Sequence, residues 1–192
     1  MKMQMKGSQT EKNILTAFAG ESQARNRYDL FSKKASKEGY EQIAEIFAQT
    51  AEHERQHAKQ LFGLLEGGEV QITASFPAGV VGSTLENLRA AAAGEHYENS
   101  IMYPEFARVA DREGFDKVAA LFRLIMISEI RHESRYLALA RNIEQGKVFT
   151  KDRPVRWVCR KCGYVHEGMS APKVCPLCQH PQAYFELDQP NY

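Results

Sequence analysis

The sequence repeats itself at a spacing of 75 residues over its N-terminal part. The segment from Ala35 to Tyr40 returns as the segment from Ala110 to Phe115. A serine followed three residues later by glutamate, the pattern of a capping box at a helix N-terminus, occurs at 8–11 and again at 83–86. Apolar residues in both copies recur every three or four positions, which indicates helices. The N-terminal part is therefore predicted to be one helical hairpin, made twice.

Each hairpin is expected to turn at a Glu-Gly pair, because glycine ends a helix in the left-handed conformation without steric cost. This predicts four helices, over residues 9–37, 40–66, 84–112 and 115–145. The segment 67–83 between the second and third helices is far longer than the ~2 to 8 residues that join antiparallel neighbours. We therefore expect a four-helix bundle with one long crossover connection.

The composition changes near residue 150. All four cysteines lie within 159–178, and five of the seven prolines follow residue 153. We expect two domains, a helical bundle over 1–148 and a small metal-binding β/loop domain over 149–192. The net charge of +1 gives no reason to expect nucleic-acid binding. No apolar run approaches the ~20 residues of a membrane span and no signal peptide is visible, so a cytoplasmic protein without a membrane partner is expected.

Charged residues interrupt the apolar face of every predicted helix. Glutamate is almost never buried without a partner, so these inward positions need a common explanation. In two helices a glutamate precedes a histidine by three positions, which places both side chains on one helix face. Combined with glutamates from the other two helices, this is the ligand set of di-iron carboxylate bundles. The candidate ligands are Glu21, Glu54, His57, Glu95, Glu98, Glu129 and His132.

The repeat slips by one residue within the third predicted helix. Glu21 and Glu95 are 74 residues apart, whereas Tyr28 and Tyr103 are 75 apart. One extra residue in a helix is the mark of a π-bulge, and such bulges are frequent at functional sites. We therefore predict a π-bulge near Glu98.

Two glycines precede the first candidate ligands of their helices. Gly20 and Gly94 lie inside predicted helices, where each costs ~1 kcal/mol relative to alanine. A close approach between helices would explain why glycine is used at both positions.

The segment from His53 to His57 also matches the H-E-x-x-H pattern of zinc proteases. The repeat argues against that assignment, because the second copy has Ser128 where the first has His53. His53 is expected at the surface or beside the ligands, although the pattern leaves it open as a ligand. A buried salt-bridge network is disfavoured, because Arg25 is the one basic residue near the inward positions apart from histidine.

Two C-x-x-C pairs, separated by twelve residues, form the candidate site of the C-terminal domain. In a reducing compartment this pattern indicates a metal site and not disulfides. Four thiolates suit tetrahedral zinc and iron equally well. Neighbouring aromatic residues and the use of a one-electron iron beside a di-iron centre favour iron. The four ligands are Cys159, Cys162, Cys175 and Cys178.

With these motifs, the chain resembles the rubrerythrin family along almost its whole length. The resemblance implies a mainly α protein, a ferritin-like four-helix bundle with a long crossover followed by a rubredoxin-like domain. Besides the two Glu-x-x-His pairs, three segments carry it: 19–25, 94–98 and 159–168.

The resemblance also implies a role for each ligand. Glu54 and Glu129 would bridge two irons, and Glu21 would bind one of them. Glu95 and His132 would bind the other. One iron would exchange Glu98, in the oxidised state, for His57, in the reduced state. Tyr28 and Tyr103 would donate hydrogen bonds beside the oxygen ligands. The implied content is two irons in the bundle and one in the cysteine site per chain.

The activity that the resemblance implies is the reduction of hydrogen peroxide to water. Electrons would arrive through the rubredoxin-like iron from an external donor, such as rubredoxin or a reductase, because no G-x-G-x-x-G segment for a nicotinamide follows a strand. A homodimer with electron transfer between subunits is also implied. Two alternatives stay open at this stage: a ferroxidase or iron-storage protein that uses dioxygen, and a non-enzymatic protein with zinc in the cysteine site.

Overall fold

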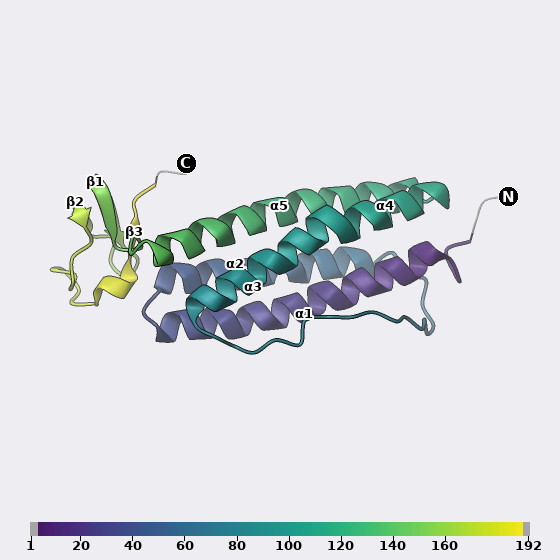
Figure 1. The fold of residues 1–192 in the computed structure, drawn as a ribbon, viewed down its shortest axis with the longest axis horizontal. Helices are drawn as coiled ribbons and strands as arrows, with labels where there is room; N and C mark the ends of the chain where they lie inside the picture. The colour runs from purple at the N-terminus through teal and green to yellow at the C-terminus, as the bar shows by residue number, and fades with distance from the viewer. Residues whose placement is uncertain (1–3, 190–192) are drawn as a thin grey trace.

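The computed structural model describes residues 4–189, and five α-helices make up its larger part. Figure 1 shows these helices side by side along the long axis of the molecule, with a small strand-containing unit at one end. No helix within residues 4–189 is long and apolar enough to cross a membrane. The helices are α1 (Gln9–Lys37), α2 (Glu41–Phe62), α3 (Thr84–Tyr97), α4 (Tyr103–Arg112) and α5 (Asp116–Glu144).

The predicted helices agree with the structure except at the end of the second one. The prediction extended it to residue 66, but α2 ends at Phe62. Beyond Gly63, the amides of Leu64 and Leu65 donate to carbonyls three residues back, so the chain tightens into a turn. Leu64 and Leu65 then pack against the apolar core, which anchors the start of the crossover.

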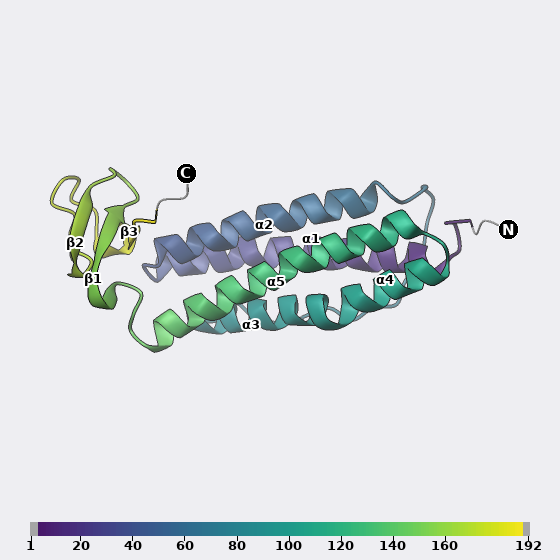
Figure 2. The same cartoon turned by 90° about the horizontal axis from the view of Figure 1, so that it is seen from above.

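The two hairpin turns and the crossover have the predicted form. Gly39 and Gly114 adopt φ angles of +82° and +78°, in the left-handed region that favours glycine. The crossover after α2 contains no helix or strand before α3 begins at Thr84. Figure 1 shows it running along the bundle beside α1, and Figure 2 shows α3 and α4 following each other on one side of α5.

Each hairpin turn also caps the first helix of the other hairpin. The carboxylate of Glu38, at the end of α1, accepts hydrogen bonds from the Thr84 amide at 2.8 Å and its hydroxyl at 2.6 Å. The carboxylate of Glu113, at the end of α4, accepts the equivalent bonds from Thr10 at 2.8 and 2.6 Å. A carboxylate at a helix N-terminus satisfies free amides and opposes the positive end of the helix dipole. The two hairpins are therefore joined at both ends of the bundle.

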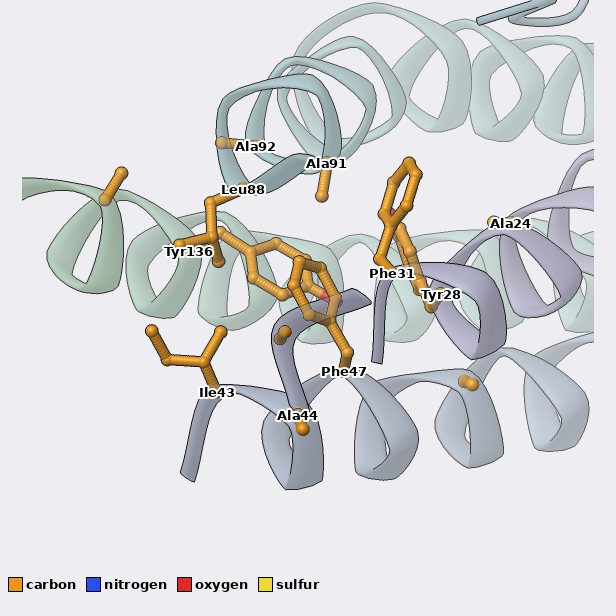
Figure 3. Close-up of a cluster of buried hydrophobic side chains, with 13 residues drawn as sticks. Ala24, Tyr28, Phe31, Ile43, Ala44, Phe47, Leu88, Ala91, Ala92 and Tyr136 are labelled. Carbon is orange, nitrogen blue, oxygen red and sulfur yellow. The ribbon is translucent and has the colours of Figure 1, made fainter. Parts of the chain in front are cut away.

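The bundle has two apolar clusters with a polar layer between them. On α1, Ala17 belongs to one cluster and Ala24 to the other, with Glu21 between them. On α2, Glu54 lies in the same way between Ala51 and Leu61. Figure 3 shows the cluster that contains Ala24 and Ala51, in which aromatic rings from α1, α2 and α5 meet. The polar layer is therefore closed off from solvent along the bundle axis on both sides.

The C-terminal unit is a three-stranded antiparallel sheet in the order β2-β1-β3. Its core contains Trp157, Phe185 and two of the cysteines. It contacts the bundle through Tyr40, whose ring stacks on Phe149 at 6.2 Å between centroids. The strands are β1 (Thr150–Cys159), β2 (Val165–Ser170) and β3 (Phe185–Leu187).

The cap between the hairpins predicts a specific acid sensitivity. Burial alone would raise the pKa of Glu38, but hydrogen bonds from Lys34 and Thr84 outweigh it and lower the pKa from 4.5 to about 2. The carboxylate therefore stabilises the fold above pH 4.5, and this contribution is lost as the pH falls from 4.5 towards 2. Because Glu38 is partly exposed, we expect Glu38→Gln to lower the free energy of unfolding of the metal-free protein by only about 1 kcal/mol at pH 7.

Urea unfolding followed by circular dichroism at a series of pH values measures this difference. The difference in free energy of unfolding between Glu38→Gln and the unmodified protein should disappear as the pH approaches 2. The control is Glu69→Gln, which removes the same negative charge from an exposed residue of the crossover. It should leave the free energy of unfolding unchanged at every pH. A difference that persists at low pH would contradict the proposed charge effect.

Candidate metal centres

Six of the seven predicted bundle ligands meet in the polar layer as two overlapping groups. In each group the ligand atoms lie within 4.8 Å of one another. Glu54 and Glu129 belong to both groups. Two ions that share two carboxylates would fit this arrangement. The first group is Glu21, Glu54, His57 and Glu129, and the second is Glu54, Glu95, Glu129 and His132.

The contacts within these groups have the geometry of ligands around a shared ion. His57 Nδ1 lies 2.9 Å from an oxygen of Glu54 and 2.9 Å from one of Glu129. Despite these distances, His57 Nδ1, both Glu54 oxygens and Glu129 Oε1 have no partner in hydrogen-bond geometry within residues 4–189. Buried polar atoms are almost always satisfied, so their lone pairs need a common positive partner. The donor set, carboxylate oxygen with imidazole nitrogen, fits iron.

The pKa values show how strongly the cluster requires positive charge. Burial raises the pKa of Glu21 to about 7 and also raises those of Glu95 and Glu129. Burial opposes protonation of the two histidines, but the negative charge of the surrounding carboxylates, which accept from the protonated rings, outweighs it. It raises the pKa of His57 and raises that of His132 to about 12. These shifts favour the binding of positive charge, whether protons or cations, among the clustered carboxylates.

Two tyrosines connect the halves of the cluster. The hydroxyl of Tyr28 donates to Glu95 Oε1 at 2.5 Å, and the hydroxyl of Tyr103 donates to Glu21 Oε1. Burial, followed by the charge of the bonded carboxylate, raises the pKa of both tyrosines, so both stay protonated as donors. Each tyrosine therefore orients a candidate ligand from the other hairpin.

Glu98 is the one candidate bundle ligand that the structure does not bring into these groups. It begins η1, a π-helix over Glu98–Met102, which confirms the predicted π-bulge. Its carboxyl lines a cavity beside the cluster and is only partly buried as a residue. Burial and the charges of Glu21 and Glu95 raise its pKa. The raised pKa favours the protonated form of the Glu98 carboxyl group.

His53 lies beside a ligand. Its Nδ1 is 3.0 Å from His132 Nε2, and the two rings stack with centroids 5.2 Å apart. This contact occupies the ring nitrogen of His132 that faces away from the carboxylates. It fixes the ring so that Nδ1 points into the cluster.

The two helical glycines do not have the role that the sequence indicated. A Cβ at Gly20 would meet the Phe76 ring at 3.7 Å, and one at Gly94 would meet the Arg27 guanidinium at 3.9 Å. Neither contact is with another helix backbone, so the expected close approach of helices is wrong. Both glycines instead line the cavity that Glu98 reaches. Sequence analysis missed Arg27 because it faces this cavity and lies off the apolar face.

The four cysteines converge in the C-terminal unit as predicted. All are free thiols, and their sulfurs lie within 4.8 Å of one another. The Cys159–Cys178 and Cys162–Cys175 sulfur distances are both 3.7 Å. A disulfide would require about 2.05 Å. A tetrahedral ion with metal–sulfur bonds of ~2.3 Å separates its ligands by about 3.8 Å. The spacing therefore fits a tetrahedral metal site.

Comparison with known proteins agrees with both centres. The family model Rubrerythrin matches residues 12–140, and the model of the rubrerythrin rubredoxin-like domain matches residues 157–186. The chain belongs to the rubrerythrin family. The resemblance seen in the sequence is thereby confirmed, and so is the fold class.

Curated rubrerythrins are similar over nearly their whole length. Rubrerythrin from Nitratidesulfovibrio vulgaris is 57% identical over 95% of this chain and 96% of its own. Rubrerythrin from Porphyromonas gingivalis is 58% identical over 100% of this chain and 96% of its own. The rubrerythrin-family architecture therefore extends over both units of the chain.

Solved structures give the same fold. Fully reduced, all-ferrous nigerythrin superposes with a TM-score of 0.63 at 36% identity, over 94% of this chain and 87% of its own. Mycobacterium tuberculosis bacterioferritin superposes with a TM-score of 0.59 over 71% of this chain and 86% of its own. Its identity of 19% shows only that the bundle is ferritin-like.

Charge repulsion in the cluster predicts an unusual stabilising mutation. Glu21 has a folded pKa of about 7 against an ordinary value of 4.5, so stability of the metal-free protein is lost as the pH rises from 4.5 to 7. Glu21→Gln removes this titration and keeps an acceptor for Tyr103. We expect it to raise the free energy of unfolding of the metal-free protein by about 2 to 3 kcal/mol at pH 7 and by much less at pH 4.5.

Thermal and urea unfolding of chelator-treated protein at both pH values provide the measurement. Glu66→Gln, the same substitution at an exposed position, serves as the control. The interpretation of the cluster is wrong if Glu21→Gln destabilises the metal-free protein at pH 7 as much as an ordinary buried substitution does.

Proposed function

We propose that the protein is a non-haem di-iron peroxidase that reduces hydrogen peroxide to water and protects against oxidative stress. The observation that carries this proposal is the pair of ligand groups sharing Glu54 and Glu129, in a chain with its own four-cysteine site. The proposed iron ligands are the six clustered residues and Glu98, with a third iron on the four cysteines. Ligands of this kind in a rubrerythrin-family chain support an oxidoreductase.

The bound irons would supply Lewis acidity and the two electrons that cleavage of the peroxide bond consumes. The chain supplies the proton chemistry. Glu98, with its raised pKa and its place outside the ligand groups, is suited to deliver a proton to a leaving oxygen. Tyr28 and Tyr103 hold Glu95 and Glu21 in fixed orientations while the charge of the cluster changes.

We also propose that Glu98 and His57 alternate as ligands. His57 Nδ1 lies within the first ligand group, whereas Glu98 lies outside it. This arrangement corresponds to the one proposed for the reduced protein, in which a neutral imidazole suits a less positive cluster. In the oxidised protein the more positive cluster would favour the anionic carboxylate of Glu98.

The four-cysteine site would pass electrons from an external donor, such as rubredoxin or a separate reductase. Free cysteines used as ligands suit a reducing compartment, and we propose the cytoplasm. Figure 1 places the C-terminal unit at one end of the bundle. The polar layer lies farther along the helices, between the two apolar clusters. A homodimer in which each cysteine site serves the partner's cluster would shorten the path for electrons.

An exposed apolar stripe on α5 supports such a dimer. Its members recur at helical spacing and are between 46% and 65% exposed. A stripe of this kind is costly to leave in water and fits a self-complementary interface. The stripe contains Leu124, Ile127, Ile130 and Leu137.

The dimer is tested by sedimentation velocity on the full-length, metal-loaded chain. The unmodified protein should sediment as a dimer, and Ile127→Glu should shift the population towards monomer because it buries an unpaired charge. Val80→Glu, at an exposed residue of the crossover outside the stripe, is the matched control. A dimer that persists in Ile127→Glu would exclude the stripe as the interface.

The proposed activity is tested by anaerobic rapid mixing of the reduced protein with peroxide or with dioxygen. We expect oxidation by peroxide to be much faster, together with three irons per chain by metal analysis. Comparable rates would favour the ferroxidase alternative, which uses dioxygen. Zinc in the cysteine site and no redox change in the bundle would instead favour a non-enzymatic protein.

A further inference from the structure

A cavity of about 410 Å³ adjoins the candidate di-iron centre and has no role in the function proposed so far. It lies between α1 and the segment around η1, and the crossover covers it. Gly20 and Gly94 line it, and so does Glu98. The liquid volume of one water molecule is about 30 Å³, so the cavity admits several small molecules. Its lining extends from Phe76 and Pro77 of the crossover to Glu98.

Two unsatisfied polar atoms belong to residues on the wall of this cavity. Gln23 Oε1 and Arg27 Nε are buried and have no hydrogen-bond partner within residues 4–189. They lie four residues apart on α1, which puts them on the same helix face. Arg27 also forms no ion pair with any carboxylate in the described chain. One unsatisfied atom is a hydrogen-bond donor and the other is an acceptor.

Neighbouring contacts hold both side chains at the wall. The Gln23 amide nitrogen donates to the Pro77 carbonyl of the crossover at 2.6 Å, so the free oxygen is the remaining half of an anchored group. The Arg27 guanidinium lies 5.7 Å from the ring centroid of Tyr28, whose hydroxyl donates to Glu95. The side chains that carry the donor and the acceptor are therefore held in place at the cavity wall.

We propose that this cavity is the entrance for the peroxide, and that Gln23 and Arg27 select it over dioxygen. Hydrogen peroxide both donates and accepts hydrogen bonds, so it can accept from Arg27 Nε and donate to Gln23 Oε1. Dioxygen has no hydrogen to donate and is a poor acceptor, so it gains nothing from either group. Glycine at positions 20 and 94 keeps the wall free of side chains between this subsite and Glu98.

The proposal rests on the proposed peroxidase function, and its test separates the two. Loss of a hydrogen bond from a charged donor weakens binding by about tenfold or more. In Arg27→Met, the ratio of the peroxide rate constant to the dioxygen rate constant of the reduced protein should fall about tenfold. Arg27→Lys, which keeps the charge but moves the donor, should restore part of this ratio. Arg89→Met, at an exposed arginine on α3, is the control and should keep the ratio.

A binding measurement that does not depend on turnover completes the test. In zinc-loaded protein, which cannot transfer electrons to peroxide, added hydrogen peroxide should shift the Arg27 Nε–H resonance in a ¹⁵N-correlated NMR spectrum. The resonance of Arg89 should stay in place. If unmodified protein prefers peroxide but Arg27→Met keeps the full ratio and no resonance shifts, the inference fails and the peroxidase stands. If the unmodified protein shows no preference for peroxide, the proposed function itself fails.

Discussion

Repulsion among buried carboxylates is the constraint on which the bundle depends. Four glutamates at most 1% exposed lie between two apolar clusters, and few protein groups are available to compensate them. The pKa shifts of Glu21, Glu95 and Glu129 show the cost of ionising them without cations. Fold and metal binding are therefore linked, because ions that bind the native cluster remove the repulsion and stabilise the native state. The apolar clusters on each side give the layer its rigidity and keep bulk water out.

The internal repeat explains why the centre is nearly symmetric. Tyr28 of the first hairpin donates to Glu95 of the second, and Tyr103 of the second donates to Glu21 of the first. The symmetry breaks at the π-helix, which shifts Glu98 out of the ligand groups and into the cavity wall. One half of the centre thereby gains a carboxyl group that lies outside the ligand groups. A centre with two identical halves would lack such a group.

Periodicity and spacing were sufficient to predict the bundle, the crossover and the convergence of six of the seven bundle ligands. Helical period fixes which residues face inward, so the sequence alone places Glu54 and His57 on one helix face. The single-residue slip between the repeats was sufficient to locate the π-helix. The end of α2 was not predictable in this way, because the shift to three-residue hydrogen bonds after Gly63 depends on how Leu64 and Leu65 pack. The cavity beside Gly20 was also missed, because it depends on where the crossover lies and the crossover has no periodicity.

The reciprocal capping by Glu38 and Glu113 has a consequence for the origin of the chain. Ser8 and Ser83 cap the first helix of their own hairpins, but the carboxylate that binds Thr10 or Thr84 in the first turn comes from the other hairpin. The same holds for the hydroxyl groups that orient Glu21 and Glu95. An ancestral single hairpin could have completed these bonds only by associating with an identical molecule. Gene duplication and fusion would then have turned an intermolecular assembly into one polypeptide and released each half to diverge.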